Sequence, residues 1–155
     1  MSLFDTLTGT RRPSPGVAPR SAEEIRRALL GLNGSETAYV VRVGTSGEGA
    51  DLVAEWRIRE LRMRLRTRMR LVPETCEVRA LDERWEASTP DAPGMRYSRG
   101  AGFKVDRRWT YEKGPDGRRH LVETFRFDSR DMRNALVRAV LDAGWTWRGV
   151  VFGKL

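Results

Sequence analysis

One stretch of the chain, residues 61 to 71, alternates without interruption between mostly apolar side chains and arginine. The arginines are Arg62, Arg64, Arg66, Arg68 and Arg70. Successive side chains of a β-strand point to opposite faces, so the alternation predicts a strand with one apolar and one arginine-bearing face. A helix would also collect several apolar positions on one stripe, but it would place Met63 and Thr67 off that stripe. We therefore predict a strand, with a turn or bulge at Glu60 that resets its phase.

Period-two patterns of β-branched, aromatic and aliphatic residues recur along most of the remaining chain. They predict strands over residues 37–43, 51–58, 75–87, 95–98, 103–111, 118–127 and 145–155. The turn sequence Gly114-Pro115-Asp116-Gly117 joins two of these strands into a β-hairpin. Because successive strands are linked by turns, we expect antiparallel pairing.

Two segments have helical patterns instead. Ser21 and Glu24 form a capping box that starts the first helix, which ends before Gly34. The second helix follows a cap at Asp128 or Ser129. Its apolar residues cover much more than one narrow stripe, which predicts a helix buried on more than one side.

The predicted order is a helix, a run of strands, a helix and a closing strand. We expect an α+β fold with a strand-rich antiparallel sheet, strongly curved or closed into a barrel of about seven to nine strands, around the second helix. This order resembles the tubby and scramblase-like barrel, in which an apolar C-terminal helix threads the sheet. The resemblance concerns architecture and transfers no functional residue. Residues 21–155 are expected to form one domain, preceded by a flexible Pro-, Gly- and Arg-rich segment, residues 1–20.

The net charge of +8 comes from a chain in which 26 of the 29 basic residues are arginine. Two explanations stay open. Codon usage in a GC-rich bacterial genome favours arginine irrespective of function. Alternatively, the planar guanidinium group serves recognition of phosphate or carboxylate. Either way, such a surplus attracts anionic partners.

Little in the sequence indicates catalysis or metal binding. Cys76 is the single cysteine and His120 the single histidine, so neither an internal disulfide nor a zinc motif is possible. We expect Cys76 to be a small core residue on a strand and His120 to be exposed beside the hairpin turn. The glycines of residues 44–49 are followed by a strand, not by a helix, which favours a hairpin loop over a phosphate-binding loop. We expect no cofactor and no metal, and a binding role rather than an enzyme.

The arginine row is the best candidate site. On a strand, its side chains would project from one face about 6.6–7 Å apart, which suits a phosphate backbone or another anionic surface. Arg148, beside Trp145 and Trp147, is a further candidate for such a surface. The alternative is a solvated face paired across the sheet with acidic residues such as Glu55 or Glu77, and a core role for the tryptophans.

The sequence therefore favours a non-catalytic binding module whose partner is nucleic acid, a phospholipid headgroup or an acidic protein. A protein-interaction or assembly component without a ligand site is the first alternative. An enzyme with carboxylate and arginine groups in a cavity is the second. We expect a cytoplasmic protein, because neither a signal peptide nor a transmembrane segment is recognisable. The oligomeric state is left open.

Overall fold

The computed structural model describes residues 2–88 and 94–155, which form two compact units. The first unit comprises Met1–Ala101 and Met132–Leu155, and the second comprises Gly102–Asp131. No helix in the described part of the chain is both long enough and apolar enough to cross a lipid bilayer.

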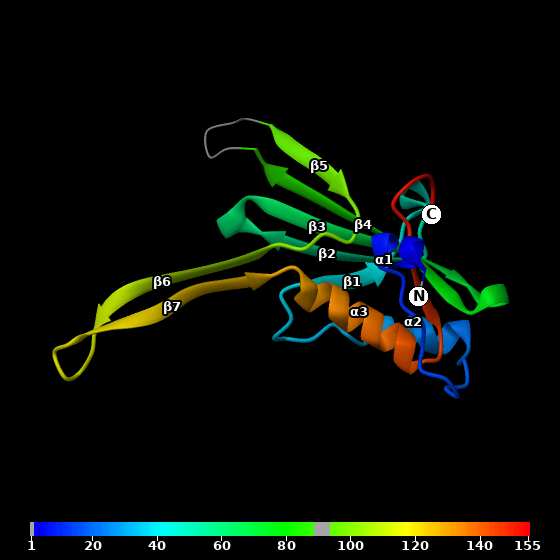
Figure 1. Cartoon of the computed structure of the whole chain (residues 1–155), viewed down its shortest axis with the longest axis horizontal. Helices are drawn as coiled ribbons and strands as arrows, with labels where there is room; N and C mark the ends of the chain where they lie inside the picture. Colours follow the sequence, from blue (N-terminus) through cyan, green and yellow to red (C-terminus); the bar gives the residue numbers. More distant parts are fainter. Residues whose placement is uncertain (1, 89–93) are drawn as a thin grey trace. The chain divides into compact units, whose positions relative to one another are not determined.

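The first unit contains helices and strands from both ends of the chain (Figure 1). The helices are α1 (Leu3–Thr8), α2 (Ala22–Leu30) and α3 (Arg130–Asp142), and the short 3-10 turns are η1 (Ser46–Glu48), η2 (Arg59–Leu61) and η3 (Pro73–Thr75). The strands are β1 (Val40–Val43), β2 (Leu52–Ile58), β3 (Met63–Val72), β4 (Glu77–Ala87), β5 (Met95–Arg99) and β8 (Thr146–Gly149).

The strands form a six-stranded sheet in the order β1-β2-β3-β4-β5, with β8 also on β4. All pairs along β1 to β5 are antiparallel, as predicted from their connecting turns. β8 pairs with β4 in parallel, beside β5, because β4 is long enough to hold both strands end to end. The α+β class and the antiparallel, strand-rich sheet are thus confirmed.

The predicted barrel is not confirmed, because the described strands form an open sheet. α3 buries Met132, Leu136, Val137 and Val140 but leaves Arg138 exposed. The helix therefore needs cover along one side, which one face of an open sheet can supply. The resemblance to the tubby and scramblase-like barrel fails at this point, since closure of the sheet is what defines that architecture.

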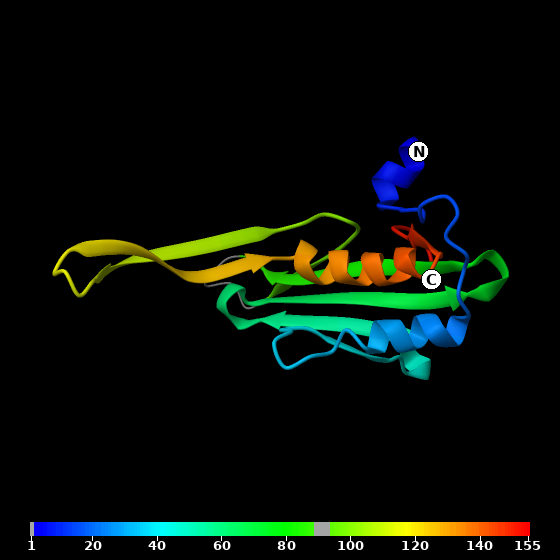
Figure 2. The same ribbon diagram turned by 90° about the horizontal axis from the view of Figure 1, so that it is seen from below.

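The core lies between one face of the sheet and the two longer helices. Figure 2 shows α2 and α3 in front of the same face of the sheet. Ile25 and Leu29 of α2 and Leu136 of α3 are almost fully buried, as are Met69 of β3 and Trp147 of β8. These residues remove enough apolar surface from water to hold the two layers together.

Residues 2–20 make specific contacts within this unit. Arg11 exchanges two main-chain hydrogen bonds with Trp147, each of 2.8 Å. Asp5 is buried against Arg12 at 2.6 Å, and the indole Nε1 of Trp145 donates to the carbonyl oxygen of Arg20 at 2.7 Å. The expected flexibility of residues 1–20 concerns motion and stays a prediction, but these contacts favour a docked segment.

The second unit is the hairpin predicted around the turn at residues 114–117. β6 (Val105–Lys113) pairs with β7 (Arg119–Asp128) in antiparallel register, with a bulge between Arg108 and Trp109. Lys104 and Ser129 close the base of the hairpin, because each main-chain amide donates to an oxygen of the other residue. The predicted hairpin is confirmed. Whether residues 21–155 behave as one domain stays a prediction.

Candidate anion-binding face

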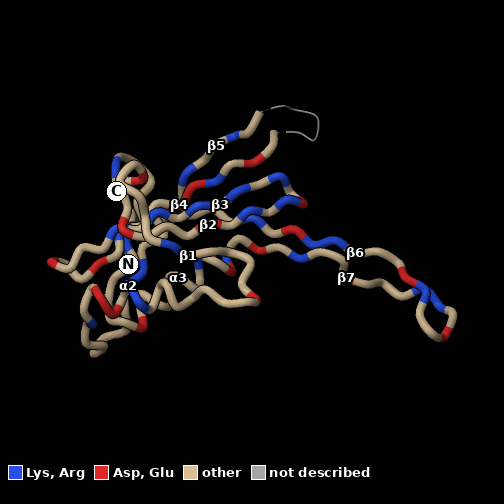
Figure 3. Tube along the Cα trace, turned by 180° about the vertical axis from the view of Figure 1, so that it is seen from behind, with Lys and Arg blue, Asp and Glu red and all other residues tan. Residues whose placement is uncertain are grey.

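The sheet face opposite α2 and α3 carries the arginine row and is called the arginine face here. Arg64, Arg66, Arg68 and Arg70 project from it, because the alternate positions of β3 are buried toward the helices. Figure 3 shows basic residues recurring along β3. The strand prediction for this segment is confirmed, with β3 starting two residues later than expected.

Arg62 does not belong to the row. The turn η2 precedes it, and Arg62 itself has a left-handed backbone with φ of 47°. The predicted change of phase at Glu60 is confirmed, and the 3-10 turn is its cause. Arg62 is exposed beside the start of β3.

The centre of the arginine face is neutralised by Glu83 of β4. Its Oε1 accepts from the Nε atoms of Arg66 at 3.1 Å and Arg68 at 2.8 Å, while its Oε2 accepts from the hydroxyl of Tyr97. The Glu83 side chain is 3% exposed. Burial alone would raise the pKa of Glu83, but the hydrogen bonds from Tyr97, Arg66 and Arg68 outweigh it and hold the pKa below its ordinary value.

A second carboxylate reaches the face from the loop between β1 and β2. Both terminal nitrogens of Arg42 donate to Glu48, at 2.8 and 2.7 Å. The Glu48 main-chain oxygen also accepts from Arg68 at 2.8 Å. The hydrogen bonds from Arg42 are the main cause that lowers the pKa of Glu48 to about 2. The loop is the predicted hairpin loop between antiparallel strands, and it places the Glu48 carboxylate 3.9 Å from Arg66 on this face.

One end of the row opens into a basic hollow. This hollow has a volume of about 370 Å³ and is lined by Arg57, Ile58, Arg59, Arg62, Met63, Arg64 and Met95. Its described lining thus holds four arginines and no acidic residue. Arg57 and Arg64 are directly opposite each other in the pairing of β2 with β3, so two like charges face each other there.

Arg64 is held in place at this hollow by an aromatic ring. Its guanidinium lies 4.3 Å from the ring centroid of Trp85. The Nε atom of Arg64 is buried and has no hydrogen-bond partner among the described residues. A buried donor without a partner costs about 1–3 kcal/mol.

The other end of the row continues across the sheet. Arg70, Arg79 and Arg148 are cross-strand neighbours on β3, β4 and β8. Arg148 donates from Nε to Glu77 at 2.7 Å, and Arg70 donates to the main-chain oxygen of Leu155 at 3.2 Å. This end is therefore partly neutralised.

The structure brings together only some of the residues selected from the sequence. Arg64 and Arg62 line the hollow, while Arg66 and Arg68 are occupied by carboxylates and Arg148 lies beyond β4. Trp145 and Trp147 are core residues and offer no stacking edge. Sequence reasoning missed Arg57 and Arg59. The tight turn between two alternating strands is the signal that could have placed them opposite the start of the row.

Cys76 and His120 take no part in this face. The prediction for Cys76 is wrong: it is a half-buried turn residue with φ of 51° at the end of η3, outside the strand. His120 is exposed in the hairpin as expected, with its Nε2 3.0 Å from a carboxylate oxygen of Asp116. Within the described ranges, no three His, Cys, Asp or Glu side chains gather as a metal-binding set.

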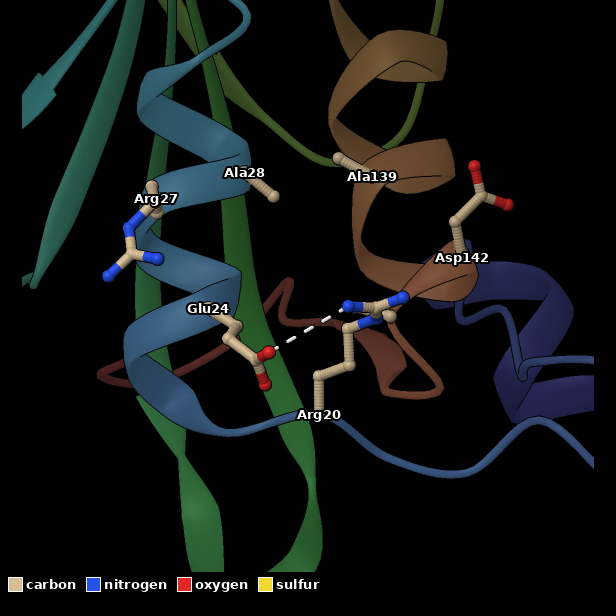
Figure 4. Close-up of a pocket in the computed structure, with 7 residues that line it drawn as sticks. Arg20, Glu24, Arg27, Ala28, Ala139 and Asp142 are labelled. Carbon is tan, nitrogen blue, oxygen red and sulfur yellow. Dashed lines mark ion pairs between the residues drawn. The ribbon is translucent and has the colours of Figure 1, made fainter.

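A groove of about 480 Å³ also separates α2 from α3 (Figure 4). Ala28, Ala139 and Ala143 form its apolar part. Arg20 and Glu24 form an ion pair of 3.7 Å at one end, and Asp142 lies on α3. Charges of both signs therefore border this groove, in contrast to the basic hollow.

Comparisons with protein-family models, with curated proteins and with solved structures found no match to this chain.

Proposed function

We propose that this protein is a non-catalytic module that binds a phosphate-bearing ligand at the basic hollow. The observation that carries the proposal is the set of four arginines around one hollow whose described lining contains no carboxylate. Guanidinium groups match the planar, bidentate geometry of phosphate oxygens better than lysine does. A lipid headgroup and a nucleic acid end both present such a phosphate.

The electrostatics of the arginine face support this location over the centre of the row. At the centre, Glu83 and Glu48 already occupy Arg66 and Arg68. A polyanion would have to displace these contacts, at a cost similar to what it gains. At the hollow, an anion would relieve the repulsion between Arg57 and Arg64 instead.

The test removes three charges at the hollow and compares the loss with an equal change elsewhere. The variant is Arg57→Ser, Arg59→Ser, Arg64→Ser. The control is Arg11→Ser, Arg27→Ser, Arg138→Ser. The probes are fluorescent single-stranded and double-stranded DNA, phosphatidylcholine vesicles with and without an anionic phospholipid, and polyglutamate, each over a salt series.

We expect the hollow variant to lose at least about tenfold in affinity for one phosphate-bearing probe, and the slope of log K against log salt to become shallower. The control should lose less, because its three arginines lie outside the basic hollow. The probe that distinguishes the variant from the control identifies the source of the phosphate. Equal losses in both variants, or preferential binding of polyglutamate, would contradict the proposal.

A role in protein interaction or assembly is the second candidate. Leu3, Phe4 and Leu7 of α1 are exposed on a short helix whose other side is docked. Exposed apolar side chains of this kind mark interaction surfaces. Weak binding of every probe, unchanged in both variants, would favour this candidate.

An enzyme is the weakest candidate in geometric terms. Glu83 is the most buried carboxylate on the arginine face, but three donors and a lowered pKa leave it unsuited to accept a proton. We keep a cytoplasmic location as part of the proposal, because a chain with a single cysteine does not depend on an oxidising compartment for its stability.

A further inference from the structure

One face of the β6–β7 hairpin combines aromatic and basic side chains and is called the ribbon face here. Alternation along β6 and the register with β7 place its members on one side. They are Val105, Arg107, Trp109, Tyr111 and Lys113 of β6, and Arg119, Leu121, Glu123, Arg126 and Asp128 of β7.

The middle of the ribbon face is apolar and exposed. Trp109, Tyr111 and Leu121 are 48%, 69% and 58% exposed. Tyr111 is directly opposite Leu121, and Trp109 is the next residue of β6 on the same side, so the three side chains form one patch. Large aromatic side chains normally bury most of their surface. Their joint exposure on a two-stranded ribbon indicates a surface that receives a partner.

Basic pairs bracket this patch at both ends. Arg107 is directly opposite Arg126, and Lys113 is directly opposite Arg119. Like charges in directly opposed positions destabilise a ribbon unless a counter-charge lies between them. From Arg107 to Lys113 the strand covers about 20 Å, so the two pairs stand well apart on either side of the aromatic rings.

The acidic residues of the ribbon face are already occupied. Glu123 pairs with Arg107 at 3.3 Å, and the same guanidinium lies 5.4 Å from the ring centroid of Trp109. Asp128 pairs with Arg130 at 2.8 Å. The face therefore keeps a positive surplus beside its rings, which is complementary to a chain of phosphates carrying flat bases.

We propose that the ribbon face binds single-stranded nucleic acid, with bases stacked on Trp109 and Tyr111 and phosphates held by Lys113, Arg119 and Arg126. Two rings on alternate residues of a strand lie about 6.6 Å apart, so each can receive its own base. This inference concerns a different unit of the protein from the basic hollow, and it stands without the proposed function.

The chemistry of the hairpin disfavours other partners. A duplex hides its base faces, so it would use the basic pairs but not the rings. Insertion into a lipid bilayer would require an apolar tip, whereas the tip is the polar turn at residues 114–117 with Asp116 paired to His120. An acidic protein would satisfy the cations but give the exposed rings no stacking partner.

The test uses the full chain and fluorescein-labelled oligo-dT, measured by anisotropy and by quenching of tryptophan fluorescence. The variant is Trp109→Ala, Tyr111→Ala. The control is Thr110→Ala, Val122→Ala, a directly opposed pair on the other face of the same ribbon. A second variant, Trp109→Phe, Tyr111→Phe, keeps the rings. Circular dichroism verifies that each protein is folded.

We expect the alanine variant to lose at least about tenfold in affinity for oligo-dT, and the control less than about twofold. The phenylalanine variant should retain most of the affinity, because stacking needs only an aromatic face. The proposal is overturned if the alanine variant binds oligo-dT like the wild type, or if the alanine variant and the Thr110→Ala, Val122→Ala control lose affinity equally. It is also overturned if the alanine substitutions weaken binding of duplex DNA as strongly as binding of oligo-dT.

The experiments distinguish failure of the ribbon-face proposal from failure of the proposal for the basic hollow. The hollow variant with Arg57→Ser, Arg59→Ser and Arg64→Ser should keep ring-dependent quenching by oligo-dT. Loss of oligo-dT affinity in the hollow variant, with the alanine variant binding like the wild type, would assign the nucleic acid to the arginine face and remove it from the hairpin.

Discussion

At the scale of single residues, Glu83 decides which arginines are available. It is the shared partner of Arg66, Arg68 and Tyr97, and it turns the middle of a basic strand into a closed network. Arg64, two residues earlier, has a ring beneath it and a buried nitrogen without a described partner. Arg66 lies 4.9 Å from the same Trp85 ring, so the two neighbours share that ring and differ in the carboxylate that pairs with Arg66.

We expect the substitution Glu83→Ala to destabilise the fold by about 2–4 kcal/mol. The reason is that two partly buried guanidinium groups lose their carboxylate, and the remaining exposure of each lets water offset part of the loss. Urea unfolding followed by tryptophan fluorescence measures the change. The matched control is Glu74→Ala on the exposed turn η3, for which we expect a change within about 0.5 kcal/mol. Equal stability of the two variants would contradict the network described here.

The sequence predicted the arginine row itself but not the state of each member. Alternation depends on neighbouring residues, and it was enough to identify the strand and its two faces. The partner Glu83 lies 17 residues after Arg66, and only the pairing of β3 with β4 brings the two together. The basic hollow likewise depends on the register between β2 and β3, which places Arg57 opposite Arg64.

At the scale of elements, β8 near the C-terminus holds the N-terminal segment beside the sheet. It pairs with β4 on one side and with Arg11 on the other. Gly149 makes the second contact possible, because its α-carbon lies directly against the main chain of Thr8. The period-two pattern of residues 145–155 predicted a strand. That strand covers only four residues, since the chain beyond Gly149 leaves the sheet.

The substitution Gly149→Ala is expected to release residues 2–12 from β8. A methyl group there would overlap the carbonyl oxygen of Thr8, which belongs to the main chain and has little room to move. Hydrogen exchange measures the release, as at least about tenfold faster exchange of the amide of Arg11.

Gly47→Ala is the control, because a methyl group at that glycine would meet open space. Unchanged exchange at Arg11 in the Gly149 variant would show that the segment is not held by this contact. Fast exchange at Arg11 in the unmodified protein would support the expected flexible segment.

At the scale of the whole molecule, the chain divides into two compact units. The middle of the hairpin is mostly exposed, so few buried contacts depend on it. Stability should therefore reside in the sheet and its two covering helices, where the large buried side chains are found.

Shortening the hairpin tests this division. Replacing residues 107–126 by Asn-Gly would leave Asp106 and Phe127 as the closing pair of a two-residue turn. We expect the midpoint of thermal unfolding to change by less than about 3 °C, which corresponds to about 1 kcal/mol for a chain of this size. Binding of oligo-dT should be lost. A much larger fall in the midpoint would show that both units unfold as one domain.

The sequence by itself determined the local elements of this protein: the strand of alternating arginines, the hairpin, the capping box of α2 and the start of α3. Each depends on residues within a few positions, where side-chain periodicity and turn chemistry act directly. Only the tertiary structure decided that the sheet stays open, that Glu83 closes the middle of the row, and that Arg57, Arg59, Arg62 and Arg64 share one hollow. The first two features follow from contacts between residues that are distant in the chain, and the third follows from the register across the short turn between β2 and β3.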